Sequence, residues 1–230
     1  MIPILQETAA FVVCLKPAGV SSQGEAGSAL PQLLKNQLKC DIFPVHRLDQ
    51  AVGGVMVYAK TAKEAARLSA CIAAGTFDKT YLAVVAGCPA EARGEWEDLL
   101  FHDRAKNRTY VVRRLRGGVK KARLAYEVLA AQDEKSLVRV RLYTGRTHQI
   151  RVQFASRGFP LAGDGKYGSR DHGCTCALWS HLLEFPAADG RILSFCAPMP
   201  AGYPWDAFRA AYSGSAGASG SGAAQNTPAK

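Results

Sequence analysis

The chain has 230 residues, enough for one large domain or two small ones with a sizeable hydrophobic core. Hydrophobic residues make up 48% and charged residues 21%, as in an ordinary soluble globular protein, and the net charge of +10 favours a polyanionic partner, nucleic acid first. The chain has no apolar run near the roughly 20 residues that span a bilayer, and its start does not resemble a signal peptide, so we expect a cytoplasmic protein with no membrane partner.

Two short elements precede the most unusual stretch. Residues 11–15 predict a buried strand ended by a proline–glycine turn, and residues 30–39 predict a short basic helix. His46-Arg47-Leu48-Asp49 then leads into residues 50–60, whose apolar run reads as a buried strand. Asp49 is therefore expected on a loop at the mouth of a strand, where rigid structure can present a reactive carboxylate. Alone, the tetrapeptide also fits a plain turn in which Arg47 pairs with Asp49.

A helix and a strand are predicted next. Thr61 and Glu64 form a capping box at the start of a helix over 62–74. Residues 79–87 predict a strand with Tyr81 near its beginning. The Tyr81 ring either points into a cleft or is an ordinary half-buried strand tyrosine.

The middle of the chain is expected to be rich in strands. Residues 88–106 are predicted to be a connecting segment without regular structure. Three strands are predicted after it, at 109–116, 122–129 and 137–143. Gly117-Gly118 predicts a hairpin between the first two. In the third, Arg139, Arg141 and Tyr143 share one face, which suits a phosphate backbone and equally a solvated sheet surface.

The second unusual stretch is Thr144-Gly145-Arg146-Thr147-His148-Gln149-Ile150-Arg151. Thr147 is predicted to cap a helix that continues through Phe154, which places Arg146 just before a helix N-terminus, where backbone donors favour anions. Taken alone, Arg146 is also an ordinary surface arginine.

The last part of the chain begins with a glycine-dense loop, residues 163–168, which lacks the residue order of a Walker loop. Its Asp164 is expected to fix backbone amides. The remaining expectations are strands near 178–185 and 191–196, a helix opening at Pro204, and a disordered Gly-, Ser- and Ala-rich tail over 213–230.

The seven cysteines are odd in number and scattered, which fits free thiols in a reducing compartment. Cys174 and Cys176 are separated by one residue, a poor match to the spacing of structural zinc pairs. Metal binding is therefore a minor alternative.

Five stretches, in order, resemble the RluA-type RNA pseudouridine synthases. They are Lys16-Pro17-Ala18-Gly19; His46-Arg47-Leu48-Asp49, running into a strand that ends Ala59-Lys60; Lys79-Thr80-Tyr81-Leu82-Ala83; Gly145-Arg146-Thr147-His148-Gln149-Ile150-Arg151; and Gly163-Asp164 with Tyr167-Gly168. The resemblance implies an α+β fold on a mixed, largely antiparallel sheet, with flanking helices and a central RNA-binding cleft. It also implies isomerisation of uridine to pseudouridine in ribosomal or transfer RNA without a cofactor. We expect one catalytic domain over residues 1–212, acting as a monomer.

The resemblance also implies roles for individual residues. By position, Asp49 resembles the catalytic aspartate, Tyr81 the aromatic residue that packs on the target base, and Arg146 the basic partner of the aspartate. Arg47 is expected either to help hold the opened RNA or to be a structural partner of a carboxylate.

The chain departs from the family pattern in three places. Val52-Gly53-Gly54 replaces the usual Thr-Ser-Gly, which removes two hydroxyls that could brace the loop of Asp49. Leu178-Trp179-Ser180 stands where relatives often carry Leu-His-Ala. The first motif begins at Lys16, so we expect no separate N-terminal RNA-binding domain of the S4-like kind.

Two other functions remain open from the sequence. One is a basic RNA-binding protein that does not use catalysis. The other is a carboxylate-dependent hydrolase of nucleosides or sugars, for which Asp164 is the obvious second carboxylate.

Overall fold

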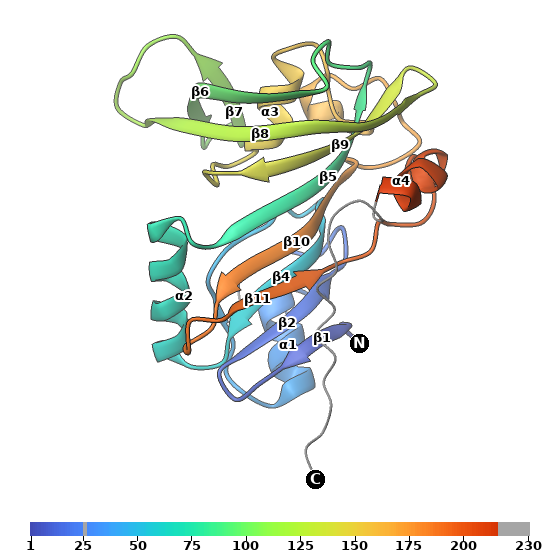
Figure 1. Ribbon diagram of the computed structural model, residues 1–230. Helices are drawn as coiled ribbons and strands as arrows, with labels where there is room; N and C mark the ends of the chain where they lie inside the picture. The colour runs from blue at the N-terminus through green and yellow to red at the C-terminus, as the bar shows by residue number, and fades with distance from the viewer. Residues whose placement is uncertain (25–26, 216–230) are drawn as a thin grey trace.

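A single mixed sheet with helices against it forms the centre of the molecule (Figure 1). The computed structural model describes residues 1–24 and 27–215. The strands are β1 (Ile4–Glu7), β2 (Phe11–Lys16), β3 (Phe43–Pro44), β4 (Gly53–Ala59), β5 (Asp78–Ala86), β6 (Arg93–Asp103), β7 (Arg108–Val112), β8 (Val119–Gln132), β9 (Lys135–Leu142), β10 (Leu178–Pro186) and β11 (Ile192–Cys196). The helices are α1 (Leu30–Leu38), α2 (Ala62–Ala74), α3 (Gln149–Ala155) and α4 (Arg209–Ser215), with 3-10 turns at Gly165–Tyr167 and Trp205–Phe208.

The strand order is β1-β2-β4-β10-β5-β9-β8-β6-β7, with β11 added to β10 and β3 added to β4. Neighbouring strands in the described chain are antiparallel, except that β10 runs parallel to β4. In Figure 1, β10 lies between β4 and β5 and so joins the first and middle parts of the chain. The expected mixed, largely antiparallel sheet is confirmed.

Helix α2 begins and ends at residues that the sequence marks as helix caps. The Thr61 hydroxyl accepts a hydrogen bond from the backbone N–H of Glu64 at 3.2 Å, and Gly75 ends the helix in the left-handed conformation. The Glu64 carboxylate does not complete the predicted capping box, because it instead accepts two hydrogen bonds from Arg67. The predicted helix is confirmed, but of the two capping-box hydrogen bonds only the one accepted by Thr61 is formed.

Strand β6 is a correction to the expected connection over residues 88–106. It pairs with both β7 and β8, so Gly117-Gly118 links two strands that are not neighbours, and the predicted hairpin there is wrong. The more buried positions of β6 alternate, but Gly94 and Asp98 occupy two of them. The hydrophobic alternation that marks a strand is therefore diluted.

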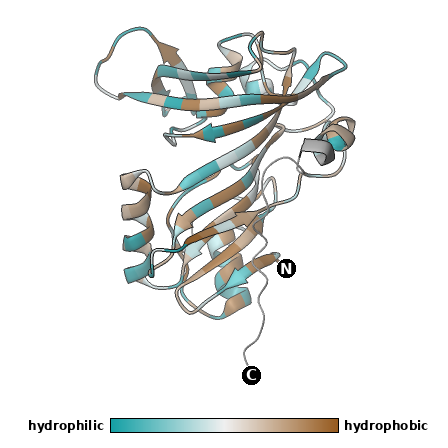
Figure 2. Cartoon of the chain, in the orientation of Figure 1, coloured by the Kyte–Doolittle hydropathy of each residue, from teal (hydrophilic) through white to brown (hydrophobic). Residues whose placement is uncertain are grey.

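The two faces of the sheet are covered differently. One core cluster joins α1 and α3 to the face that carries Tyr81, and a second cluster joins Leu68 of α2 to the opposite face. Figure 2 shows hydrophobic stretches along the central strands, and hydrophilic segments in the helix α2 and in strand β8. Leu48, next to Asp49, is buried in the first cluster, so the loop of Asp49 is anchored on the same core as Tyr81.

The end of the described chain is helical. Helix α4 ends at Ser215, three residues into the region predicted as a disordered tail, and residues 216–230 of that prediction lie outside the described residues. None of the helices described is long and apolar enough to cross a membrane. The seven cysteines are free thiols.

Candidate active site

The four residues singled out from the sequence line one cleft. The cleft has a volume of about 760 Å³ and is lined by Arg47, Asp49, Tyr81 and Arg146 among other residues. A second cleft of about 510 Å³ also contacts Arg47 and Asp49. The Asp49 side chain is 17% exposed, so a ligand in the first cleft can reach its carboxylate.

The loop of Asp49 is held by the segment that follows β2. The Ser22 hydroxyl donates to the carbonyl of Leu48 at 2.7 Å and accepts from its N–H at 3.1 Å. Gly19 and Gln50 exchange two more hydrogen bonds, of 2.8 and 2.9 Å. These contacts brace the loop without the hydroxyls that the family usually places at positions 52 and 53.

Lys16 places a buried cation behind the same loop. Its side chain is fully buried, and its ammonium donates to the carbonyls of Pro17 at 2.9 Å and Gln50 at 3.1 Å. Burial lowers the pKa of Lys16 to about 8, while the negative charge of Asp49 acts in the opposite direction. The charges of Lys16 and Asp49 therefore interact with each other across the loop.

Arg151, at the start of α3, is the basic partner of Asp49. Its Nη1 donates to Oδ2 of Asp49 at 3.1 Å. Its Nε and Nη2 donate to the two carboxylate oxygens of Asp164 at 2.7 and 2.8 Å. Burial alone disfavours the charged guanidinium, but the hydrogen bonds and negative charges around it leave its pKa raised. A permanently charged guanidinium therefore contacts and orients the Asp49 carboxylate.

Asp164 has a different role from those expected. Its side chain is 1% exposed and both oxygens are bound by Arg151. The expectation that it mainly fixes backbone amides is corrected, because its carboxylate is the partner of a guanidinium. A carboxylate held in this way is also unsuited to serve as the second acid or base of a hydrolase.

Arg146 is not paired with Asp49, which corrects that part of the prediction. Its side chain is exposed, and its Nε donates to the carbonyl of Lys121 at 2.9 Å. Helix α3 begins only at Gln149, after His148 in the left-handed conformation, and Thr147 does not cap it. The buried first turn of α3 therefore carries Arg151 toward Asp49, whereas Arg146 stays on the loop at the cleft wall.

His148 is a second neighbour of Asp49 that the sequence analysis did not single out. Its Nε2 lies 3.7 Å from Oδ2 of Asp49, and its side chain is 7% exposed. Burial lowers the pKa of His148 to about 4, with the charge of Asp49 opposing the shift. At neutral pH the ring is therefore uncharged, and the contact is not an ion pair. The three-residue spacing of His148 and Arg151, which places both on one side of a helix start, was the available signal.

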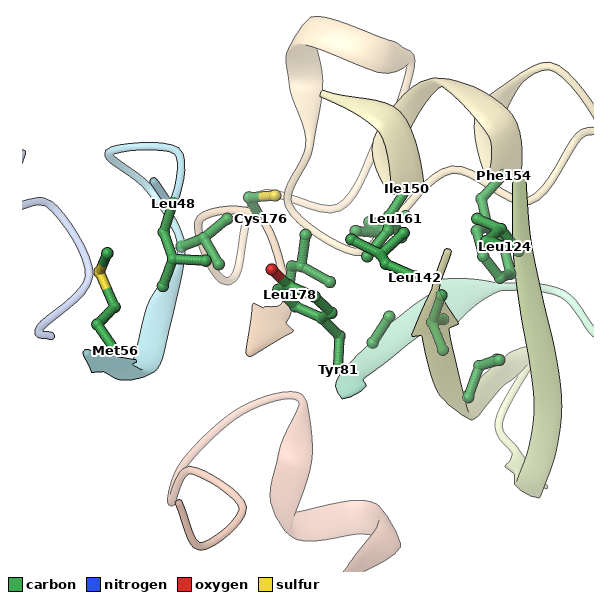
Figure 3. Packing of buried hydrophobic residues seen from close by; sticks show 14 of the residues in the cluster. Leu48, Met56, Tyr81, Leu124, Leu142, Ile150, Phe154, Leu161, Cys176 and Leu178 are labelled. Atoms are coloured by element: carbon green, nitrogen blue, oxygen red, sulfur yellow. The ribbon is translucent and has the colours of Figure 1, made fainter. Parts of the chain in front are cut away.

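Tyr81 projects from β5 into the cleft and packs into the core. Its ring is 5% exposed, and burial together with the charge of Asp49 raises its pKa, so the hydroxyl stays protonated. Figure 3 shows Tyr81 beside Leu178, between Leu48 and Ile150. The packing fixes the plane of a ring that borders the cavity, which suits stacking on a flat ligand.

The cations of the cleft differ in their partners. Arg141 pairs with Asp78 at 2.8 Å, and Arg139, on the same strand, pairs with Glu127 at 3.0 Å. The basic face of β9 thus behaves as an ion-paired sheet surface. Arg47, in contrast, is exposed, and the described residues place no carboxylate oxygen within 4 Å of it. This leaves Arg47 available to an anionic ligand.

Comparisons with known proteins agree with this site. The family model described as RNA pseudouridylate synthase matches residues 10–156. An uncharacterized RNA pseudouridine synthase of Zymomonas mobilis is 32% identical over 214 residues, covering 86% of this chain and 96% of that protein. Ribosomal large subunit pseudouridine synthase D of Nitrosomonas europaea is 33% identical over 86% of this chain and 62% of its own length. An uncharacterized RNA pseudouridine synthase of Bacillus subtilis, YhcT, is 35% identical over 72% of this chain and 57% of its own length.

A solved structure shows the same fold. Human RNA Pseudouridylate Synthase Domain Containing 1 superposes with a TM-score of 0.75 at 24% identity, covering 90% of this chain and 87% of that one. The family match, the relatives and the fold agree with the resemblance to the RluA-type enzymes. The chain belongs to the RNA pseudouridine synthases, the isomerases that convert uridine to pseudouridine in RNA.

Proposed function

We propose that this chain converts uridine to pseudouridine in ribosomal or transfer RNA, with Asp49 as its catalytic residue. The observation that carries the proposal is the accessible Asp49 carboxylate, bound by Arg151 in a cleft that Tyr81 also lines. Relatives named for the ribosomal large subunit make ribosomal RNA the first substrate to test. One chain supplies all of these side chains, which supports a monomeric enzyme, and we place it in the cytoplasm.

The reaction explains why a lone carboxylate suits this site. The bond from C1′ to N1 of the uridine breaks, the uracil turns, and C5 bonds to C1′. The proton that leaves C5 is balanced by one gained at N1, so the reaction needs no oxidant and no added atoms. Asp49 acts either as a nucleophile or as the base that removes a sugar proton. In both routes the hydrogen bond from Arg151 orients the carboxylate.

Tyr81 and Arg47 suit the handling of the target nucleotide. The uridine must leave any base stack to reach Asp49, at a cost of a few kcal/mol. A ring stacked on the detached uracil retains it while allowing it to turn in its own plane. Arg47, two residues before Asp49 and exposed at both clefts, is placed to hold the opened RNA.

The excess positive charge is concentrated beside the cleft. Residues 104–123, here called the basic arm, carry nine of the 29 Lys and Arg and none of the 19 Asp and Glu. The rest of the chain has 20 basic and 19 acidic residues, so the arm accounts for nearly all of the net charge of +10. Such a segment suits sequence-independent contact with phosphates.

The basic arm is connected to the cleft wall by hydrogen bonds. Arg146 and Gln149 donate to the carbonyls of Lys121 and Arg123, at 2.9 and 3.1 Å. In Figure 1 the loop between β7 and β8 extends on the same side of the molecule as α2, whose last residues line the cleft. RNA that places a uridine at Asp49 can therefore continue along the arm, and we assign Arg146 to this binding surface.

A tritium-release assay tests the proposal. Ribosomal and transfer RNA transcripts labelled at C5 of uracil are incubated with the wild-type chain, Asp49→Asn and, as a matched control, Asp41→Asn, which removes an exposed carboxylate paired with Lys35. We expect release to water by the wild type and the control, and none by Asp49→Asn. RNA binding without release by the wild type would favour the non-catalytic RNA-binding protein, and free uracil would favour the hydrolase.

A further inference from the structure

Both groups that reach Asp49 are themselves held by one short loop. Arg151 is bound by Asp164, and His148 is bound by Tyr167, whose hydroxyl lies 2.8 Å from its Nδ1. Asp164 and Tyr167 belong to the glycine-dense loop 163–168, to which the reaction described above assigns no part. The loop therefore contacts the catalytic carboxylate only through two intermediaries.

The first connection fixes the orientation of a guanidinium. All three nitrogens of Arg151 are engaged, two with Asp164 and one with Asp49. A bidentate carboxylate fixes the plane of a guanidinium as well as its position. The Nη1 that meets Asp49 is thus aimed by Asp164, which is too deeply buried to touch RNA itself.

The second connection selects the tautomer of His148. The backbone N–H of Thr109 donates to the Tyr167 oxygen at 2.8 Å, which leaves the phenolic hydrogen to donate to Nδ1 of His148. The proton of the neutral imidazole then resides on Nε2, the nitrogen that faces Asp49. The same tautomer is favoured from the other side, because a lone pair on Nε2 would be repelled by the carboxylate.

The loop is rigid enough to act on both residues together. The backbone N–H groups of Tyr167 and Ser169 donate to the carbonyl of Asp164, at 3.0 and 3.1 Å. Gly163 lies so close to the next segment that a Cβ there would stand 2.3 Å from the carbonyl oxygen of Cys174. The ring of Tyr167 also lies 5.1 Å from the guanidinium of Arg151. A displacement of the loop would therefore move both supports of Asp49.

We propose that Asp164 and Tyr167 are positioning residues, which set the orientation of Asp49 through Arg151 and through the Nε2–H tautomer of His148. The proposal rests on the function proposed above and adds to it a structural layer that never meets the RNA. Removal of either support should lower kcat while leaving RNA binding close to that of the wild type, since neither substitution changes Arg47 or a cation of the basic arm.

Tyr167→Phe is the sharper test, because it removes one oxygen and keeps the ring. We expect kcat to fall about 10-fold or more, within the range of outer-layer partners of reactive groups, with KM changed less than twofold. Asp164→Asn should have an effect of the same kind. The matched control is Tyr126→Phe, on β8. It removes a tyrosyl hydroxyl that donates to the carbonyl of Glu91. Thermal unfolding shows whether each variant is folded.

Two further measurements separate positioning from a general structural effect. The ¹⁵N shifts of the His148 ring should report the Nε2–H tautomer in the wild type and a tautomer mixture in Tyr167→Phe. In a His148→Gln background, whose amide N–H does not depend on Tyr167, the second substitution should cost little more activity. A wild-type kcat in folded Tyr167→Phe and Asp164→Asn, an unchanged tautomer, or fully additive losses would each overturn the proposal. Inactivity of the wild type on every RNA would instead reject the proposed function, and the shifts would still report the Tyr167 contact.

Discussion

Gly53 and Trp179 face each other across the parallel pair formed by β4 and β10, and the indole occupies the space of the missing side chain. A Cβ at position 53 would stand 2.4 Å from Cζ3 of Trp179. Both residues depart from the family pattern expected from the sequence, which usually has serine at the first position and often histidine at the second. The two departures therefore meet in one packing contact.

The first prediction concerns this pair. Gly53→Ser should lower the free energy of unfolding by about 1–3 kcal/mol, because it overpacks a filled site. Adding Trp179→His should recover only part of the loss, since the new Cβ would also lie 3.0 Å from the carbonyl oxygen of Lys16 and 3.1 Å from the N of Ala18. Urea unfolding of the wild type, both single variants and the double variant measures the coupling. Strictly additive effects would show that the two positions are independent.

The second prediction separates the two arginines of the 145–151 stretch. Arg151→Lys keeps the charge but cannot bind Asp164 and Asp49 together, so kcat should fall by about 100-fold. Arg146→Lys should leave kcat within about twofold and act on KM, because Arg146 is assigned to the RNA-binding surface. Single-turnover rates and KM for tritium release check both. A larger loss of kcat for Arg146→Lys would restore the pairing that the sequence suggested.

The third prediction concerns the pH dependence of stability. Burial lowers the pKa of His148 from 6.5 to about 4, with Arg151, Lys166 and His102 acting in the same direction and Asp49 in the opposite one. Below pH 6.5 the unfolded chain takes up a proton that the folded chain does not bind until about pH 4. The unfolding free energy should therefore fall with decreasing pH in this window, with a contribution of at most about 1.4 kcal/mol per pH unit.

His148→Gln supplies the comparison for this measurement. Denaturant unfolding between pH 7 and pH 4 should show a smaller loss of stability in the variant. Burial lowers the pKa of His46 to about 3, so His46 contributes with the same sign in both proteins, and only the difference between them reports His148. Parallel stability curves for the two proteins would contradict the assignment.

The fourth prediction tests the basic arm. Changing Arg113, Arg114 and Arg116 to Gln should reduce the slope of log affinity against log salt by about 2, the value for three phosphate contacts on a single strand. The rate at saturating RNA should stay close to that of the wild type. The control replaces by Gln three cations in or next to α1 and α2, namely Lys35, Lys39 and Lys63. Equal losses of salt dependence in the two triple variants would mean that the arm is not the RNA-binding surface.

Elements of this fold that are specified by neighbouring residues could be predicted from the sequence, and elements specified by long-range pairing could not. The helix over 62–74 is specified by its own capping residues, and the structure confirms it. Strand β6 is specified mainly by β7 and β8 on either side of it, and that long-range pairing has no local pattern. Its inward Gly94 and Asp98 weaken the alternation further.

The site shows the same division. The five motifs brought Asp49 and Tyr81 to one cleft, but the choice between Arg146 and Arg151 depends on where α3 begins. That start follows a left-handed residue, His148, which propensity does not favour there. The link from Arg151 to Asp164 joins two motifs through side-chain geometry alone, and single-sequence reasoning has no access to it.

The position of β10 has a consequence for how this enzyme is made. Strands β1 to β4 and strands β5 to β9 each pair among themselves, so both parts can assemble from stretches close in the chain. Asp49 belongs to the first part and Tyr81 to the second, and they share a cleft only once β10 has been inserted between β4 and β5. During translation, catalytic competence should thus appear only after residues 178–186 have left the ribosome. A nascent chain stopped earlier would carry both halves of the site without joining them.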